Sequence, residues 1–394
     1  HTAYRRQRQM CIRDRAGTIR SLIAGEDASL SGLANGVVTA TATNTAGASI
    51  ASGSQIAEGL KDMAITAGSD GTITARGALS GTVDAITVGM LDQSADALAN
   101  LSLSATGLAQ TLAAEPIRIG ANGDVQASAS LAGRSTASTV SGNSDALATL
   151  QADALQLDAA NTIRIGDQGS VNATASIGSS VAPLLVSSLS SGVGNATSQM
   201  GLEASGILGS APTPGNFSLI EFGGGSLGTV GATAQGLVDL RATATDGASS
   251  TILGGTGGGG IATITGIRDT ALNIGADLAR ITATATGLAN LSALSVSGDA
   301  NSTAATTTSG ILSDVTGVRV GINLADQGQI AALASQKSVA SATSVSGQAS
   351  SSLSNSSVAM QSVLLNLGGT GQLRAEAVTD LLNRSESVSG SASA

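Results

Sequence analysis

Apolar and polar residues alternate along short stretches of this chain. In the clearest stretch, residues 117–129, the apolar positions are Ile117, Ile119, Val125, Ala127 and Ala129. A period of two places one set of side chains on a buried face and the other in water, as in a β-strand. Gly120 and Asn122 interrupt the alternation, and both residue types tolerate the positive φ angles of turns. The pattern therefore predicts two strands joined by a corner.

The same pattern returns about every 49 residues, which is the mean spacing between the first and last copies. Residues 163–175 match residues 117–129 almost position for position, and looser copies cover the rest of the chain. We anchor eight imperfect repeats at the glycine that ends the first strand of each copy: Gly25, Gly68, Gly120, Gly166, Gly223, Gly275, Gly321 and Gly368. A second landmark, Val-Ser-Gly or a relative, follows most anchors. Self-similarity at a fixed period is typical of architectures in which each unit stacks on its neighbours.

The second half of each repeat is ambiguous when taken alone. The spacing of Leu and Ala between Ser144 and Asn161 suits either a strand or an amphipathic helix. The equivalent stretches of other repeats are rich in Ser and Thr, which favours a strand.

Composition limits the core that such repeats can build. The 394 residues include 52 Gly, two Phe, one Tyr and no Trp, with 42% hydrophobic and 11% charged residues. That is too hydrophobic for a disordered chain and too poor in charge for a typical compact enzyme. A thin interior of Ala, Val and Ile can still be close-packed if backbone ladders join successive coils. We predict an all-β fold, a β-solenoid or β-helix, elongated along its stacking axis if each repeat makes two coils. A β-propeller is the alternative.

The first fifteen residues differ from everything after them. They hold five of the 18 basic residues and the only His, Cys and Tyr. Their sequence, HTAYRRQRQMCIRDR, resembles the translation of sequencing-adapter read-through, which implies an artefact. We therefore expect residues 1–15 to be unstructured. Residues 16–394 are expected to form a single repetitive region, a fragment truncated at both ends.

The rest of the chain lacks the residues on which most enzymes rely. Without residues 1–15, no His or Cys is left. Acidic residues then number 26 and basic residues 13, because the first segment takes one acid and five bases. This negative charge disfavours nucleic acid as a partner, and no apolar run is long enough for a transmembrane segment. We predict no enzyme activity and no catalytic, cofactor or metal site.

The motif IxIGxxGxVxAxA, together with Ser-Val-Ser-Gly, resembles the Ala/Ser/Thr/Gly-rich tandem-repeat proteins of bacterial surfaces, which are adhesin-like. The resemblance implies a structural or adhesive segment, a stalk or binding surface, of a large secreted or cell-surface, outer-membrane-associated protein. The partners it implies are extracellular or cell-surface polysaccharide or other surface proteins. The alternative from another class is a β-helix enzyme that acts on polysaccharide.

Overall fold

The computed structural model describes residues 9–12, 21–45, 47–88, 95–112, 116–158, 161–210, 217–254, 262–314 and 319–394. Every regular element within these ranges is a β-strand, and the strands form three parallel sheets. This confirms the all-β prediction. It also resolves the ambiguous second half of the repeat, because β10 (Ser144–Leu157) is a strand.

The three sheets are called sheets A, B and C, and the strands of each sheet follow in spatial order. Sheet A contains β1 (Gln9–Ile12), β3 (Ser29–Asn44), β6 (Thr72–Thr87), β9 (Gly123–Thr139), β12 (Gly169–Ile177) with β13 (Leu184–Ser190), β16 (Leu227–Ala244), β20 (Leu278–Ser295), β23 (Gln329–Ser344) and β26 (Gln372–Ser387). Sheet B contains β2 (Ser21–Ile23), β5 (Ala64–Ala67), β8 (Ile117–Ile119), β11 (Thr162–Ile165), β15 (Ser218–Phe222), β19 (Thr270–Ile274), β22 (Val320–Leu324) and β25 (Val363–Leu367). Sheet C contains β4 (Ser49–Lys61), β7 (Ala97–Gln110), β10, β14 (Asn195–Leu208), β17 (Gly247–Gly254) with β18 (Ala262–Arg268), β21 (Ala300–Leu312), β24 (Ala349–Gln361) and β27 (Ala392–Ser393).

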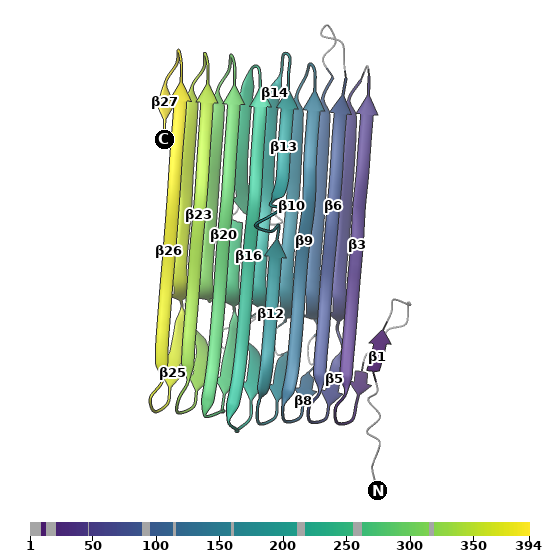
Figure 1. Cartoon of the computed structure of the whole chain (residues 1–394), viewed down its shortest axis with the longest axis vertical. Coiled ribbons are helices and arrows are strands. Elements are labelled where there is room, and N and C mark those ends of the chain that lie inside the picture. The colour runs from purple at the N-terminus through teal and green to yellow at the C-terminus, as the bar shows by residue number, and fades with distance from the viewer. Residues whose placement is uncertain are drawn as a thin grey trace.

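The chain visits sheets B, A and C in that order and then begins again (Figure 1). Ser29 pairs with Thr72, 43 residues later, and Thr72 pairs with Asp124, 52 residues later. One passage through the three sheets therefore takes one repeat, and each residue lies beside its equivalent in the next repeat. The β-propeller alternative is wrong, because propeller blades are antiparallel and these pairings are parallel.

The long axis of the molecule runs along the strands and not along the stack (Figure 1). The expectation of elongation along the stack assumed two coils per repeat, whereas the register gives one. β3 has 16 residues. At about 3.3 Å per residue such a strand is roughly 50 Å long. Each further passage adds only about 4.8 Å to the height of the stack, so the strands set the longest dimension. The structure is a slab of long strands.

The smallest side chains lie where sheets A and C approach most closely. A Cβ added to Gly107 of sheet C would lie 2.7 Å from the backbone N of Ser128 in sheet A. Equivalent positions of sheet C hold only Gly or Ala: Gly59, Gly107, Ala154, Gly206, Gly266, Gly310 and Ala359. The opposing positions of sheet A supply the two alanines of the VxAxA motif, such as Ala127 and Ala129, which are buried. Backbone contact at this waist therefore explains the repeated small residues.

The interior widens on both sides of the waist. Toward sheet B it is filled by isoleucines such as Ile65, Ile117 and Ile163, all nearly inaccessible to solvent. On the other side, leucines such as Leu101 and Leu150 fill the space between sheets A and C. A separate alanine cluster lines the corner where sheet A leads into sheet C. Aliphatic side chains thus fill most of a thin core, and Phe222 is the buried aromatic residue among the described core positions.

The segment 1–15 is described only at Gln9–Ile12. These four residues form β1, which pairs with the first residues of β3, from Gln9 with Ser29 onward. The prediction that the whole segment is unstructured is wrong for them, because the outer edge of β3 offers unpaired N–H and C=O groups to any extended segment. The other positions lie outside the described residues.

Candidate functional site

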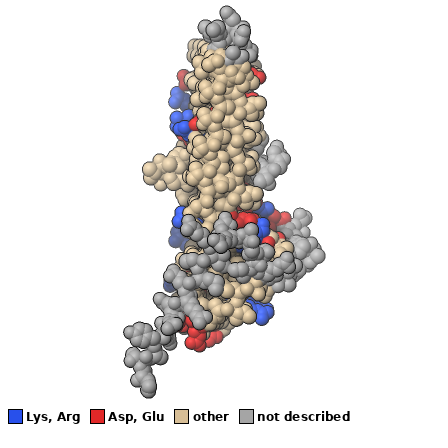
Figure 2. Space-filling view, turned by 90° about the vertical axis from the view of Figure 1, so that its right-hand side faces the viewer, with Lys and Arg blue, Asp and Glu red and all other residues tan. Residues whose placement is uncertain are grey.

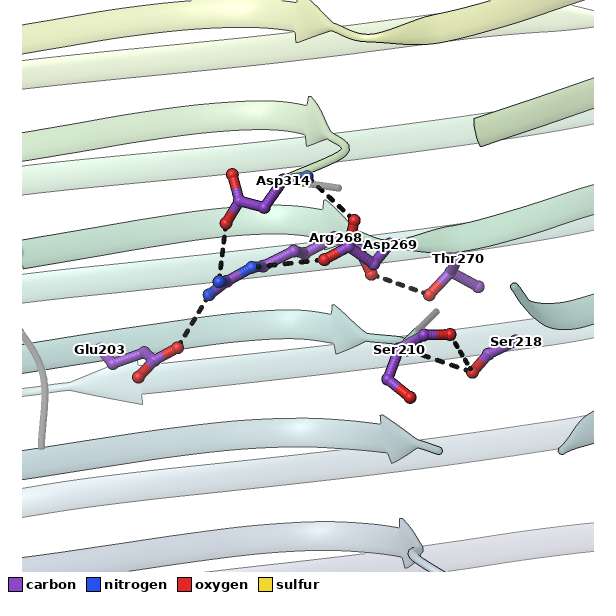
Figure 3. A network of polar contacts seen from close by, with 7 residues as sticks. All are labelled: Glu203, Ser210, Ser218, Arg268, Asp269, Thr270 and Asp314. Atoms are coloured by element: carbon purple, nitrogen blue, oxygen red, sulfur yellow. Dashed lines mark hydrogen bonds and ion pairs between the residues drawn. The ribbon is translucent and has the colours of Figure 1, made fainter. Parts of the chain in front are cut away.

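Charged side chains meet at the corner where sheet C leads into sheet B. Arg268 is the last residue of β18, and its Nη1 lies 2.9 Å from Glu203 Oε1 of β14 (Figure 3). Its Nη2 lies 2.6 Å from Asp314 Oδ2, just beyond β21. Its Nε lies 3.7 Å from Asp269 Oδ2. The guanidinium therefore links three successive passages of the chain.

The local fold of this corner depends on residues with positive φ. Asp269 has φ 48°, which Asp tolerates better than most residues, and its Oδ1 accepts a hydrogen bond from the Asp314 N–H at 2.9 Å. Asp62 repeats this geometry between β4 and β5, with φ 49° and with Oδ1 accepting from the Thr111 N–H at 2.6 Å. In both places the carboxylate holds the backbone of the next passage.

A row of polar side chains runs beside this network along sheet C. Its members occupy neighbouring positions of successive strands: Thr106, Asp153, Ser205, Thr265 and Ser309. All of them are buried. Asp153 Oδ1, Ser205 Oγ and Ser309 Oγ are buried without a well-formed hydrogen bond to a described residue, although Ser205 lies close enough to Asp153 to lower the pKa of its carboxyl group. Burial of a polar atom without a hydrogen bond lowers the free energy of unfolding, so this row of side chains destabilises the folded chain.

Asp153 is the least ordinary acid of the row. Its exposure is 0%, and its Oδ2 accepts a hydrogen bond from Gln151 Nε2 at 2.8 Å. Burial raises the pKa of Asp153 to about 7, and the Glu203 carboxylate pushes it in the same direction. Hydrogen bonding from Gln151 and the positive charge of Arg268 oppose this rise in the pKa. Near neutral pH the side chain is therefore divided between its acid and carboxylate forms.

Two neighbouring carboxyl groups with different environments are what acid–base chemistry requires. Gln151 pairs with Glu203 and Asp153 with Ser205, so Asp153 and Glu203 stand diagonally on adjacent strands. Glu203 is held by Arg268, whereas Asp153 forms no ion pair with any described residue. Because Asp153 is fully buried, no substrate reaches it in this conformation. The arrangement can store a proton and tie passages together.

The described part of the chain shows no cluster of three or more residues suited to hold a metal ion. Within the same ranges, no helix is long and apolar enough to cross a membrane. Figure 2 shows the end of the stack formed by β3, where charged residues gather in small groups and uncharged residues cover most of the described surface.

The anchor glycines line the corner where sheet B leads into sheet A, at the opposite end of sheet B from Arg268. Gly120 N–H donates to Gly68 O, and Gly166 N–H donates to Gly120 O at 3.1 Å. A Cβ at Gly120 would lie 2.6 Å from the Ser69 N of the preceding passage, which explains the need for glycine. Gly25, Gly223, Gly275 and Gly368 continue this row. None of the anchors belongs to the polar network.

Gly321 does not lie in the row of anchors, and its assignment is wrong. It pairs with Leu364 inside sheet B, and a Cβ there would meet no atom within 4 Å. Ala325 takes the anchor position, with its N–H donating to Ile274 O. The sequence VRVG, which ends at Gly321, is similar to the IRIG that ends at the anchors Gly120 and Gly166. The strand does not end at Gly321, however, because β22 continues to Leu324. Strand alternation alone cannot distinguish two registers that differ by an even number of residues.

Sequence reasoning did not find the network of Asp153, Glu203 and Arg268. Each residue occupies an ordinary polar position in an alternating strand, and about fifty residues or more separate one from the next. The one available signal was an Arg-Asp pair directly after a strand, which is typical of many turns.

Comparison with protein-family models, with curated proteins and with solved structures finds no match for this chain.

Proposed function

We propose that this chain is a β-solenoid segment of about eight repeats from a large secreted or cell-surface bacterial protein, where it serves as a stalk or an adhesive surface. The observation that carries the proposal is the continuous parallel register from one passage to the next in all three sheets. Backbone ladders of this kind resist separation of neighbouring units. Extracellular polysaccharide and other surface proteins are the partners that suit such a role.

Pulling on single molecules tests the stalk role. A solenoid unravels one passage at a time, and passages span from 43 residues (Ser29 to Thr72) to 60 residues (Glu203 to Thr263). At about 3.5 Å per extended residue, each step should lengthen the chain by roughly 150–200 Å. A single rupture that releases the whole length at once would contradict the proposal.

A polysaccharide-active enzyme is the second candidate, and the diagonal pair Asp153 and Glu203 would serve it only in a conformation that opens the buried Asp153 to substrate. Neighbouring carboxyl groups that differ in pKa can serve as acid and base in glycoside cleavage. The purified chain should be incubated with acidic and neutral polysaccharides, and new reducing ends and unsaturated products measured. Turnover that disappears in both Asp153→Asn and Glu203→Gln would establish the enzyme and overturn the stalk.

A further inference from the structure

A hollow of about 380 Å³ lies on sheet A, over the first residues of its last three strands, β20, β23 and β26. Two rows of side chains from β20, β23 and β26 line it. The first row is Arg280, Gln329 and Gln372, and the second is Thr282, Ala331 and Arg374. The hollow exists because the second row has only a single methyl group at Ala331, between two larger side chains.

Arg280 is the basic side chain of this hollow that stands without an ion pair to a described residue. The other basic side chains of the same rows and of the strands nearby stand in ion pairs, such as Arg241 with Asp239 and Lys337 with Asp380. Arg280 has no ion pair with any described residue. Its exposed guanidinium is therefore available to an anion, as is that of Arg76 elsewhere on the same sheet.

The other groups of the hollow are hydrogen-bonding groups that suit a polar ligand. Arg374 Nη2 lies 2.6 Å from Glu376 Oε2, which holds the guanidinium in place and leaves its other N–H groups available. The two glutamine amides and the Thr282 hydroxyl both donate and accept hydrogen bonds. Asp277 and Asp326 lie in the turns before β20 and β23 and do not line the hollow.

We propose that this hollow binds an acidic saccharide unit. Arg280 pairs with its carboxylate or sulfate group, because a planar guanidinium binds such oxyanions through two parallel hydrogen bonds. Gln329, Gln372 and Thr282 bind its hydroxyl groups, and the Ala331 methyl forms the floor. The volume falls within the range of roughly 300–1,000 Å³ that small-molecule sites occupy. The proposal rests on the adhesive role above and names its ligand class.

Calorimetric titration of the full chain tests this site. The probes are polygalacturonate, which carries carboxylates, dextran sulfate, which carries sulfate esters, and neutral dextran. We expect binding of at least one anionic polymer and none of dextran. Arg280→Gln should weaken binding about tenfold or more, because it removes a charge-assisted bidentate contact. Ala331→Leu should weaken it similarly without any change in charge.

The matched control is Arg76→Gln in β6, since Arg76 is on the same sheet but outside the hollow. Its affinity should change by less than twofold. Equal losses in Arg280→Gln and Arg76→Gln would show unspecific charge attraction and overturn the site, as would unchanged affinity in Ala331→Leu. Binding of neither polymer would also overturn it, while the stepwise unravelling that tests the stalk would be unaffected. Coincident melting curves show that each variant is folded.

Discussion

Asp153 shows how one buried acid makes the fold sensitive to pH. Its folded pKa, about 7, is above the ordinary value of 3.8. The folded chain therefore binds this proton more tightly than the unfolded chain. The resulting stabilisation is complete below about pH 4 and is lost as the pH rises through 7. Burial also raises the pKa of Asp145 and of Asp269, which act in the same direction.

The first prediction concerns Asp153→Asn. The free energy of unfolding of the parent chain should fall between pH 5 and pH 8, with an upper limit of about 3 kcal/mol from this group over that interval. The asparagine variant should lose most of that dependence and be the more stable of the two at pH 8. Urea titrations at both pH values measure this. Asp380→Asn, at an exposed side chain, is the control. Parallel pH profiles of the parent and Asp153→Asn would contradict the prediction.

The second prediction concerns the waist between sheets A and C. Gly107→Val places side-chain atoms against the Ser128 backbone, and backbone cannot move aside as a flexible side chain can. We expect a loss of about 3 kcal/mol or more in unfolding free energy. Gly321→Val is the matched control, because its Cβ meets open space in a strand, where valine is favoured. Equal denaturation midpoints for the two variants would contradict this explanation of the small residues.

The corner that joins sheet A to sheet C explains the Ser-Val-Ser-Gly landmark at the scale of a structural element. Ser344 Oγ accepts a hydrogen bond from the Gly347 N–H at 2.7 Å and donates one to Gly298 O at 2.8 Å. The first bond closes the corner, and the second ties it to the preceding passage. Ser387 makes the same two bonds with Gly390 and Gly347. The motif therefore forms the same hydrogen bonds between neighbouring passages each time it recurs.

The third prediction is that Ser344→Ala destabilises the chain by about 1–2 kcal/mol, since it removes one inter-passage bond and one turn bond. Hydrogen exchange should quicken at the Gly347 amide. The control is Ser352→Ala at an exposed position of β24, which should change neither quantity. An unchanged exchange rate at Gly347 would show that the hydroxyl does not hold the corner.

At the scale of the whole molecule, the one-passage register makes whole repeats removable. Deletion of residues 280–328 removes one passage and joins Ala279 to Gln329, so that β16 can pair with β23. The buried positions brought together are compatible, with Val230 facing Ile330 and Ala232 facing Ala332. The neighbours on both sides therefore find matching partners.

The fourth prediction follows from this register. The shortened chain should remain folded and melt cooperatively at a lower temperature, because it loses one set of nearest-neighbour contacts. Deletion of residues 280–303 removes about half a passage and joins the start of β20 in sheet A to the middle of β21, a strand of sheet C. Residues of sheet C would then occupy positions in sheet A, and this deletion should prevent folding. Circular dichroism and thermal melting compare the two deletions. Equal behaviour of both would contradict the stacked register.

The amino-acid pattern alone established the strands, the repeat and the thin aliphatic interior. Those features depend on which residues are buried. Burial appears in the sequence as a local alternation of apolar and polar residues, as around Ala127 and Ala129. It also located the glycine corners other than the one assigned to Gly321, because glycines such as Gly120 must fit close to backbone.

Only the tertiary structure decided how many coils a repeat makes, where Gly321 lies and which polar residues meet. Asp153, Glu203 and Arg268 come from three strands, and only the stacking register of β10, β14 and β18 brings them to one corner. Contacts between distant segments depend on which positions face each other across the stack. A local alternation of apolar and polar residues is the same for every even shift of that register, so it leaves these contacts undetermined.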